Sequence, residues 1–224
     1  MRIVKIHREG TNILILLFLV LGAVNVPIWL FLPPYTLPII FTSISGVAYI
    51  FVFNFFRSPK RKYQGERKNM VVSSVDGKVV AIEKVTEREY LKGDAIMLSV
   101  FMSPFNVHAN WYPVDGTVEY VRHHRGRFLA AYLPKASEEN ERSTVGIVTD
   151  TGIRLTLRQV AGAMARRIVT YARKGMRSTI DGHLGFIKFG SRVDLYLPLT
   201  AEILVKIDQH VKGGVTPVAR LREN

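Results

Sequence analysis

The feature that most constrains this chain is a long stretch without any charged side chain, from Thr11 to Phe56. Pro33 and Pro34 divide it into residues 12–32 and 36–56, which are 21 residues each. A helix of that length spans about 30 Å at ~1.5 Å per residue, which matches the hydrocarbon layer of a bilayer. The sequence therefore predicts an N-terminal hairpin of two membrane helices.

The charges around this stretch predict its orientation. Basic residues precede it at Arg2, Lys5 and Arg8 and follow it at Arg57, Lys60, Arg61 and Lys62. Such flanks favour both ends in the cytoplasm, with the rest of the chain on the cytoplasmic side of the cell (inner) membrane. A cleaved signal peptide is disfavoured, because the apolar stretch is too long and lacks a small-residue cleavage site. A hairpin that dips into the bilayer and returns stays open, since four prolines cluster near its middle.

The net charge of the chain is +13. Most of it belongs to residues 57–224, which carry 28 basic and 17 acidic side chains. Such a charge predicts an anionic partner, and the hairpin favours an anionic phospholipid membrane over nucleic acid. The chain has no cysteine, and its six histidines are scattered. We therefore expect no disulfide, no thiol chemistry and no metal.

After the hairpin, short apolar segments alternate with turn pairs such as Asp76-Gly77 and Asp115-Gly116, which is typical of β-structure. Strands are expected at 70–75, 78–82, 95–101, 116–121, 127–132, 143–149, 153–159, 186–189 and 193–197. One soluble helix is expected at 161–172, and His123 and His124 are interpreted as part of a solvated turn. The prediction is a mainly β fold, a compact barrel or sandwich at 58–224, preceded by the helical hairpin at 1–57.

The pair Gly190-Ser191 interrupts what otherwise resembles one strand from Phe186 to Leu197. Glycine inside a strand usually marks a bulge or a close backbone approach, so the pair alone carries little information. Its sequence context is more specific. Six blocks occur in order: NFFRSP (54–59), VDGKV (75–79), FMSPFNVHAN (101–110), ENER (139–142), QVAG with ARRIV (159–162, 165–169) and FGSRVD (189–194).

Together these blocks resemble the short-form, proenzyme-type phosphatidylserine decarboxylases, over about residues 54–198. The resemblance implies an enzyme that converts phosphatidylserine to phosphatidylethanolamine with release of carbon dioxide. It also implies a zymogen that cuts itself between Gly190 and Ser191 and turns Ser191 into a covalent pyruvoyl cofactor, which forms a Schiff base with the substrate amine. The fragments 1–190 and 191–224 are then expected to stay associated.

The chemistry supports this hypothesis independently. Decarboxylation of an α-amino acid needs an electron sink that ordinary side chains do not offer. Ser191 needs a base to attack the Gly190 carbonyl, and the candidates are His108 as base and Asp76 as the group that orients it. The alternatives are a hydrogen-bonded core histidine and an ordinary turn aspartate. In longer relatives the histidine assigned to self-cleavage aligns with Trp111, so His108 is left with cleavage, later protonation or both.

Candidates for substrate binding are less specific. Lys188 and Arg192 flank the Gly-Ser pair, Arg166 and Arg167 match phosphate chemistry, and Asn110 lies in the block around His108. The paired arginines fit the exposed face of a helix equally well. Two rival functions stay open, a non-enzymatic membrane-tethered β-domain adaptor and the same chemistry on a different serine phospholipid.

Overall fold

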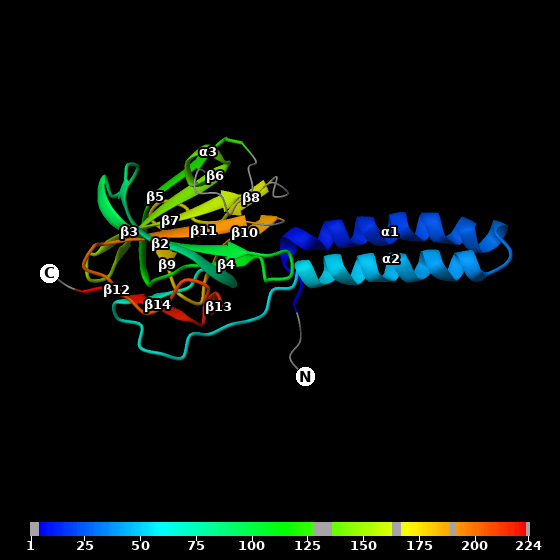
Figure 1. The fold of residues 1–224 in the computed structure, drawn as a ribbon, viewed down its shortest axis with the longest axis horizontal. Coiled ribbons are helices and arrows are strands. Elements are labelled where there is room, and N and C mark those ends of the chain that lie inside the picture. Colours follow the sequence, from blue (N-terminus) through cyan, green and yellow to red (C-terminus); the bar gives the residue numbers. More distant parts are fainter. Residues whose placement is uncertain (1–4, 128–135, 163–166, 189–190, 223–224) are drawn as a thin grey trace. The chain divides into compact units, whose positions relative to one another are not determined.

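A computed structural model describes residues 5–127, 136–162, 167–188 and 191–222. The chain divides into two compact units, Met1–Pro59 and Lys60–Asn224. Within the described residues, the first unit holds two long helices, and the second holds all the strands and one short helix (Figure 1). The predicted fold class, mainly β after an apolar helical hairpin, is confirmed.

The first unit consists of α1 (Arg8–Phe31) and α2 (Thr36–Phe55). Helix α1 begins earlier than the expected Asn12, because the His7 side chain accepts a hydrogen bond from the Glu9 N–H (3.3 Å) and caps the first turn. Both helices are long and apolar enough to cross a membrane. Their large apolar side chains are exposed, among them Leu16, Phe18, Leu30, Ile44, Val47 and Ile50.

The two helices are joined by polar side chains. Asn25 Nδ2 donates to Ser45 Oγ (2.9 Å), and Trp29 Nε1 donates to Thr42 Oγ1 (2.9 Å). Thr42 Oγ1 in turn donates to Asn25 Oδ1 (3.0 Å). Interhelical hydrogen bonds of this kind hold apolar helices together, so these polar side chains fix the pairing of α1 with α2.

The second unit is a set of short strands. They are β1 (Met70–Val72), β2 (Gly77–Glu87), β3 (Gly93–Met102), β4 (Ala109–Trp111), β5 (Gly116–His124), β6 (Arg142–Thr149), β7 (Arg154–Ala161), β8 (Arg167–Thr170), β9 (Arg177–Ser178), β10 (His183–Lys188), β11 (Ser191–Leu197), β12 (Glu202–Ile203), β13 (His210–Val211) and β14 (Pro217–Arg220), with the short helix α3 (Ala136–Glu139) before β6.

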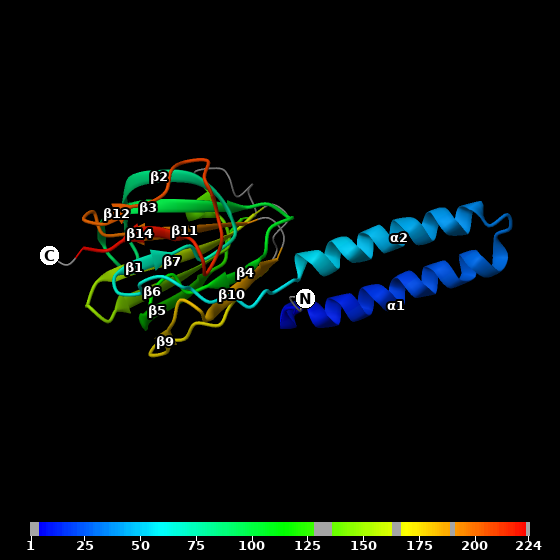
Figure 2. The same cartoon turned by 90° about the horizontal axis from the view of Figure 1, so that it is seen from below.

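Eight strands form one curled sheet in the order β13-β2-β3-β11-β7-β6-β5-β9 (Figures 1 and 2). Two smaller sheets have the orders β1-β14-β12 and β4-β10-β8. The strands of the large sheet bury one core, to which Val79, Leu98, Val145, Leu157 and Leu195 belong. Apolar residues alternating along antiparallel strands explain why these strands close around this core. A second, smaller cluster contains Tyr63, Met70, Val72 and Ile180.

Strand β11 lies in the middle of the large sheet, between β3 and β7. All seven of its residues are buried. Strand β10, which precedes it in the chain, belongs to a different sheet and pairs with β4 and β8. Strands β10 and β11 correspond to the two strands expected at 186–189 and 193–197, and they belong to different sheets. Phe189 and Gly190, between them, lie outside the described residues.

Two local predictions are wrong. The expected helix at 161–172 is contradicted at both ends, because β7 continues to Ala161 and residues 167–170 form β8, paired with β10. Ile168, Val169 and Thr170 are β-branched, and the buried side chain of Ile168 joins the core, so pairing determines the local structure. His123 and His124 end strand β5 instead of forming a turn. The expected strand at 127–132 falls outside the described residues from 128 onward.

Candidate active site

Ser191 is the first residue of β11, and its side chain is completely buried. It is paired with Met102 of β3 on one side and Ala161 of β7 on the other. Its hydroxyl donates to Met102 Sδ (3.2 Å). A thioether sulfur is a weak acceptor, so within the described residues the buried hydroxyl donates to a weak acceptor only. Gly190, the other half of the expected cleavage site, lies outside the described residues.

The two charged residues that follow Ser191 neutralise each other. Arg192 Nε lies 2.9 Å from Asp194 Oδ1, and the exposed fractions of the two side chains are 4% and 0%. The Asp194 carboxylate also accepts from Ser99 Oγ (2.7 Å) and Ser137 Oγ (2.6 Å). A buried ion pair supported by extra hydrogen bonds fixes the strand that starts at Ser191. Arg192 is therefore held inside the protein by its ion pair with Asp194.

His108 precedes β4 and is fully buried. Its Nδ1 lies 3.0 Å from the Asn106 carbonyl oxygen. Since a carbonyl only accepts, Nδ1 carries the proton, and in the neutral ring Nε2 is the basic nitrogen. The ring centroid is 6.4 Å from that of Phe186, and the His108 carbonyl accepts from the Ile187 N–H (3.3 Å). His108 thus lies against β10, the strand that leads to the expected cleavage site.

Asn110 belongs to an internal network. Its Nδ2 donates to the His108 carbonyl (3.1 Å), and its Oδ1 accepts from Gln159 Nε2 (2.6 Å). Gln159 Oε1 in turn accepts from Thr170 Oγ1 (2.6 Å). Asn110 is fully buried, so it positions the backbone of His108.

Asp76 lies in the turn before β2, and Arg61 binds both of its carboxylate oxygens. The Gly213 N–H also donates to Asp76 Oδ1 (2.9 Å), and Arg61 Nη1 donates to the Gly213 carbonyl (2.7 Å). The Arg61 guanidinium lies 4.7 Å from the centroid of the Trp111 ring. A Cβ atom at Gly213 would lie 2.7 Å from that ring, so this close contact requires glycine.

The structure therefore places the expected residues in two groups. His108 contacts β10, close in the chain to Ser191, whereas Asp76 is held by Arg61 and Gly213. Of the described contacts, no hydrogen bond joins Asp76 to His108 or either of them to Ser191. The group that contacts Asp76 is Arg61, which also lies over the Trp111 ring, and not the expected His108.

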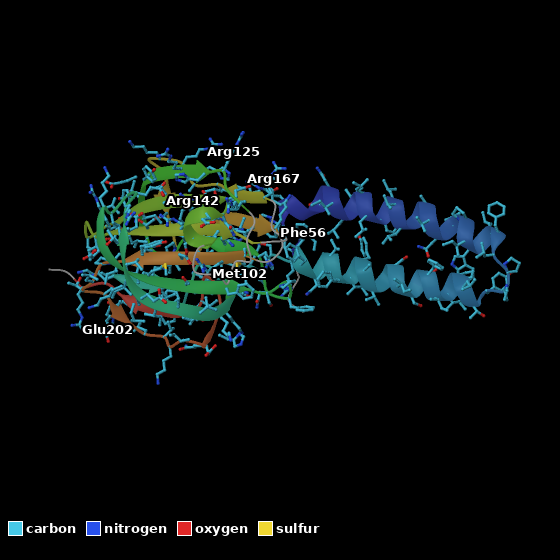
Figure 3. The ribbon with its side chains drawn as sticks, turned by 45° about the horizontal axis from the view of Figure 1, so that its top comes forward. Phe56, Met102, Arg125, Arg142, Arg167 and Glu202 are labelled. Carbon is cyan, nitrogen blue, oxygen red and sulfur yellow. The ribbon has the colours of Figure 1, made fainter. Side chains whose placement is uncertain are left out.

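Two of the expected phosphate-binding cations lie on neighbouring strands. Arg167 begins β8 and is exposed (Figure 3). It is paired in register with Lys188, the last residue of β10. Arg166 lies outside the described residues. Among the described residues, no cluster of three or more histidine and acidic side chains is arranged to hold a metal ion.

Three residues around the site were not identified from the sequence: Arg61, Met102 and Asp194. Arg61 was counted only among the basic residues that flank the hairpin, although its position ahead of an Asp-Gly turn permits the ion pair. Asp194 belongs to the FGSRVD block, and an acidic residue two positions after an arginine on one strand lies on the same face, which is a usable signal. No sequence signal identifies Met102, because its contact with Ser191 depends on the register between β3 and β11.

Comparison with known proteins places this chain among decarboxylases, because the family model of phosphatidylserine decarboxylase matches residues 48–219. A protein of Parabacteroides distasonis named phosphatidylserine decarboxylase proenzyme is 51% identical over 217 residues, which cover 97% of this chain and 99% of that protein. Proteins with the same name from Bacteroides thetaiotaomicron and Porphyromonas gingivalis are 50% and 47% identical over 220 residues, and each match covers 98% of this chain. The matched residues cover 96% of the Bacteroides thetaiotaomicron protein and 100% of the Porphyromonas gingivalis protein.

The chain therefore belongs to the phosphatidylserine decarboxylase family, and it is a decarboxylase. The resemblance found from the six sequence blocks is confirmed. The adaptor alternative is excluded by the same matches, which extend over nearly the whole chain.

Proposed function

We propose that this chain is a self-processing, pyruvoyl-dependent enzyme that converts phosphatidylserine to phosphatidylethanolamine and carbon dioxide. The observation that carries the proposal is Ser191, a fully buried serine whose hydroxyl has only a thioether acceptor within the described residues. It lies where the chain passes from one sheet into another. The relatives are named proenzymes, which supports maturation by processing.

Processing would begin with attack of Ser191 Oγ on the Gly190 carbonyl carbon. The Gly190–Ser191 amide bond breaks as an ester bond forms, and the serine nitrogen gains a proton. Elimination then breaks the ester, releases the Gly190 carboxylate and leaves dehydroalanine at position 191. Hydrolysis of its imine form releases ammonia and leaves a pyruvoyl group. Only water enters and only ammonia leaves, so no oxidant or metal is needed.

The surroundings of residue 191 fit such a group. Its strand neighbours are Met102 and Ala161, both fully buried, so the position is small, apolar and closed to bulk water. When present, the group would supply a ketone carbonyl that can condense with the substrate amine and so provide the electron sink that decarboxylation needs. Low polarity around it would prevent loss by side reactions with water.

His108 is proposed as the group that moves protons. With Nδ1 donating to the Asn106 carbonyl, Nε2 is the nitrogen that would accept a proton during cleavage or, once protonated, donate it after decarboxylation. Asn110 and the Ile187 N–H bind the His108 carbonyl and hold the residue against β10. Asp76 is proposed to support cleavage indirectly, by fixing Gly213 and Arg61, because its carboxylate is committed to them.

The two fragments of the cut chain are expected to stay associated. Residues 191–224 contribute β11, which is hydrogen-bonded to β3 and β7 on its two sides, and β13 and β14, which pair with β2 and β1. A strand with neighbours on both sides cannot leave without opening the core. The hairpin is proposed to anchor the enzyme in the inner membrane with the β unit on the cytoplasmic side, as the basic flanks favour.

The test compares three single variants of the full chain with wild type. Ser191→Ala should remain one uncut, inactive chain, because alanine has no nucleophile. His108→Ala should slow cleavage, decarboxylation or both by ~10² to 10⁴-fold, the usual effect of general acid–base groups. Asp76→Asn should lower the rate of self-cleavage while the variant still folds. Decarboxylation by Ser191→Ala at the wild-type rate would eliminate the mechanism.

A further inference from the structure

The strand register brings several segments to the end of the large sheet at which β11 begins. There Ser191 pairs with Met102, the last residue of β3, and His124, the last residue of β5, pairs with Arg142, the first of β6. Strand β7 ends there as well, because its last residue, Ala161, is the other partner of Ser191. We call this edge, together with the turn that follows β3, the Ser191 end of the β unit.

An exposed aromatic side chain lies in that turn. Phe105 is 68% exposed, the largest value for a large apolar side chain in the described part of the β unit. The turn is held by Asn106, whose Oδ1 accepts from the N–H (2.9 Å) and the Oγ (2.8 Å) of Ser103. The Asn106 carbonyl also binds Nδ1 of His108 (3.0 Å). A fixed turn therefore presents the Phe105 ring to the outside, next to the proposed acid–base residue.

Exposed arginines surround the same end. They lie at the end of β5, just beyond it and at the start of β8: Arg122, Arg125, Arg127 and Arg167. Figure 3 shows Arg125 and Arg167 toward the end of the β unit where Met102 lies, whereas Glu202 lies toward the opposite end. These arginines outnumber the acidic side chains described next to them, Glu139 and Glu141. The Ser191 end therefore has a surplus of positive charge, which attracts anionic surfaces.

We propose that the Ser191 end docks on the surface of an anionic phospholipid bilayer, with the Phe105 ring inserted among the head groups and the exposed arginines bound to lipid phosphates. An apolar side chain within a ring of cations suits such a surface, because the ring enters the apolar boundary while guanidinium groups pair with phosphate oxygens. The acyl chains of a phospholipid substrate hold it in the bilayer, so the end that carries residue 191 has to approach the membrane. The proposal rests on the phospholipid substrate of the proposed function, and it adds a membrane contact on the β unit itself, separate from the hairpin.

The experiment uses the full-length chain, and the absence of cysteine from the sequence allows one position to be labelled at a time. Phe105→Cys carries an environment-sensitive fluorophore and is reconstituted into vesicles of phosphatidylcholine, with or without phosphatidylglycerol, an anionic lipid that is not the substrate. In the anionic vesicles the emission should shift to the blue, and quenchers on the acyl chains should reduce it. High salt or the added changes Arg125→Gln and Arg167→Gln should weaken both effects.

The matched control is Leu199→Cys with the same label. Leu199 is also an exposed apolar residue (48%), but it lies beyond the other end of β11. Its label should report water in both kinds of vesicle.

A second measurement compares two forms of the substrate. Phe105→Ser should lower the ratio of the decarboxylation rate on phosphatidylserine in vesicles to the rate on a short-chain phosphatidylserine dissolved as monomers. The expected decrease is about 10-fold, the effect of losing one apolar side chain from the membrane interface. Leu199→Ser should leave the ratio unchanged.

A label at position 105 that stays in water, an equal shift at position 199, or a shift independent of anionic lipid would overturn the proposal. A shift that appears in neutral detergent and grows with protein concentration would also overturn it, and would assign the Ser191 end to contact with a second copy of the chain. An unchanged rate ratio in Phe105→Ser would overturn it as well. Failure of the proposed function is a different result, because it would appear in wild type as an uncut, inactive chain whatever the label reports.

Discussion

The helical hairpin and the β unit arrange their side chains in opposite ways. In the hairpin, apolar residues such as Phe18 and Ile44 are exposed, and the polar pair Asn25 and Ser45 joins the helices. In the β unit the apolar residues form the core, and polar groups inside it are paired, as in the buried ion pairs Arg192–Asp194 and Arg158–Glu87. The hairpin thus exposes the kind of side chain that the β unit buries, which is the arrangement expected of helices that lie in lipid.

Removing the hairpin should produce the largest effect. The full chain should fractionate with membranes, and a chain lacking residues 1–56 should lose most of this association, because the exposed apolar surface is gone. Binding that persists should be weakened by salt, since residues 57–224 retain 28 basic against 17 acidic side chains. Equal partitioning of the intact and shortened chains in a membrane pellet assay would contradict the anchor.

In the β unit, breaking the buried ion pair should be costly. Asp194→Asn leaves the Arg192 charge buried without its counterion, so the free energy of unfolding should fall by about 3–5 kcal/mol. The control is Glu202→Gln, which breaks an exposed pair with Arg222 and should cost at most about 1 kcal/mol. Denaturant unfolding in detergent measures both. Similar losses of unfolding free energy in the two variants would show that burial does not determine how much an ion pair stabilises the fold.

In the hairpin, breaking a polar contact should cost less. Asn25→Leu removes hydrogen bonds that join α1 to Ser45 and Thr42 of α2, and such bonds between membrane helices are worth about 0.6–1.7 kcal/mol. Val20→Leu, at an exposed apolar position of the same helix, is the control and should have no effect. Titration of both variants with a denaturing detergent checks this order. A loss for Asn25→Leu as large as that for Asp194→Asn would refute the comparison.

The smallest expected effect is a pH dependence at Glu89. Burial by itself raises the pKa of Glu89, but hydrogen bonds from His124, Thr144 and Tyr120 outweigh it and hold the pKa below its usual value. A lowered carboxyl pKa stabilises the fold above the pKa of the unfolded chain, and this stability is lost as the pH falls through the folded pKa. Glu89→Gln should therefore be less sensitive to acid below about pH 4 in melting experiments. An unchanged acid profile would assign the sensitivity to other carboxylates.

The parts predicted well are those set by local composition. The hairpin follows from the absence of charge, and strands such as β3 and β6 follow from their own apolar alternation. Strand β8 was predicted as a helix because a short apolar run fits both periods, and its pairing with β10 decides between them. The short strands β4 and β12 were not expected, since each exists only through its partners.

The site divides in the same way. Ser191, His108 and Asp76 were identified from their sequence blocks, but their contacts were not. Asp76 is held by Gly213, which is far away in the sequence, and no local pattern reports that distance. The partners of Asp76 were missed because a carboxylate is equally compatible with a histidine or an arginine beside it.

The central claim is that Ser191 becomes the cofactor, and the masses of the denatured wild-type fragments test it most directly. Cleavage before Ser191 should yield a fragment of the 34 residues from 191 to 224. This fragment should be lighter by one ammonia than the peptide expected from simple hydrolysis, and it should resist amino-terminal sequencing because its first residue has no α-amino group. A single intact chain with full decarboxylase activity, or a fragment that begins with an ordinary serine, would contradict the claim.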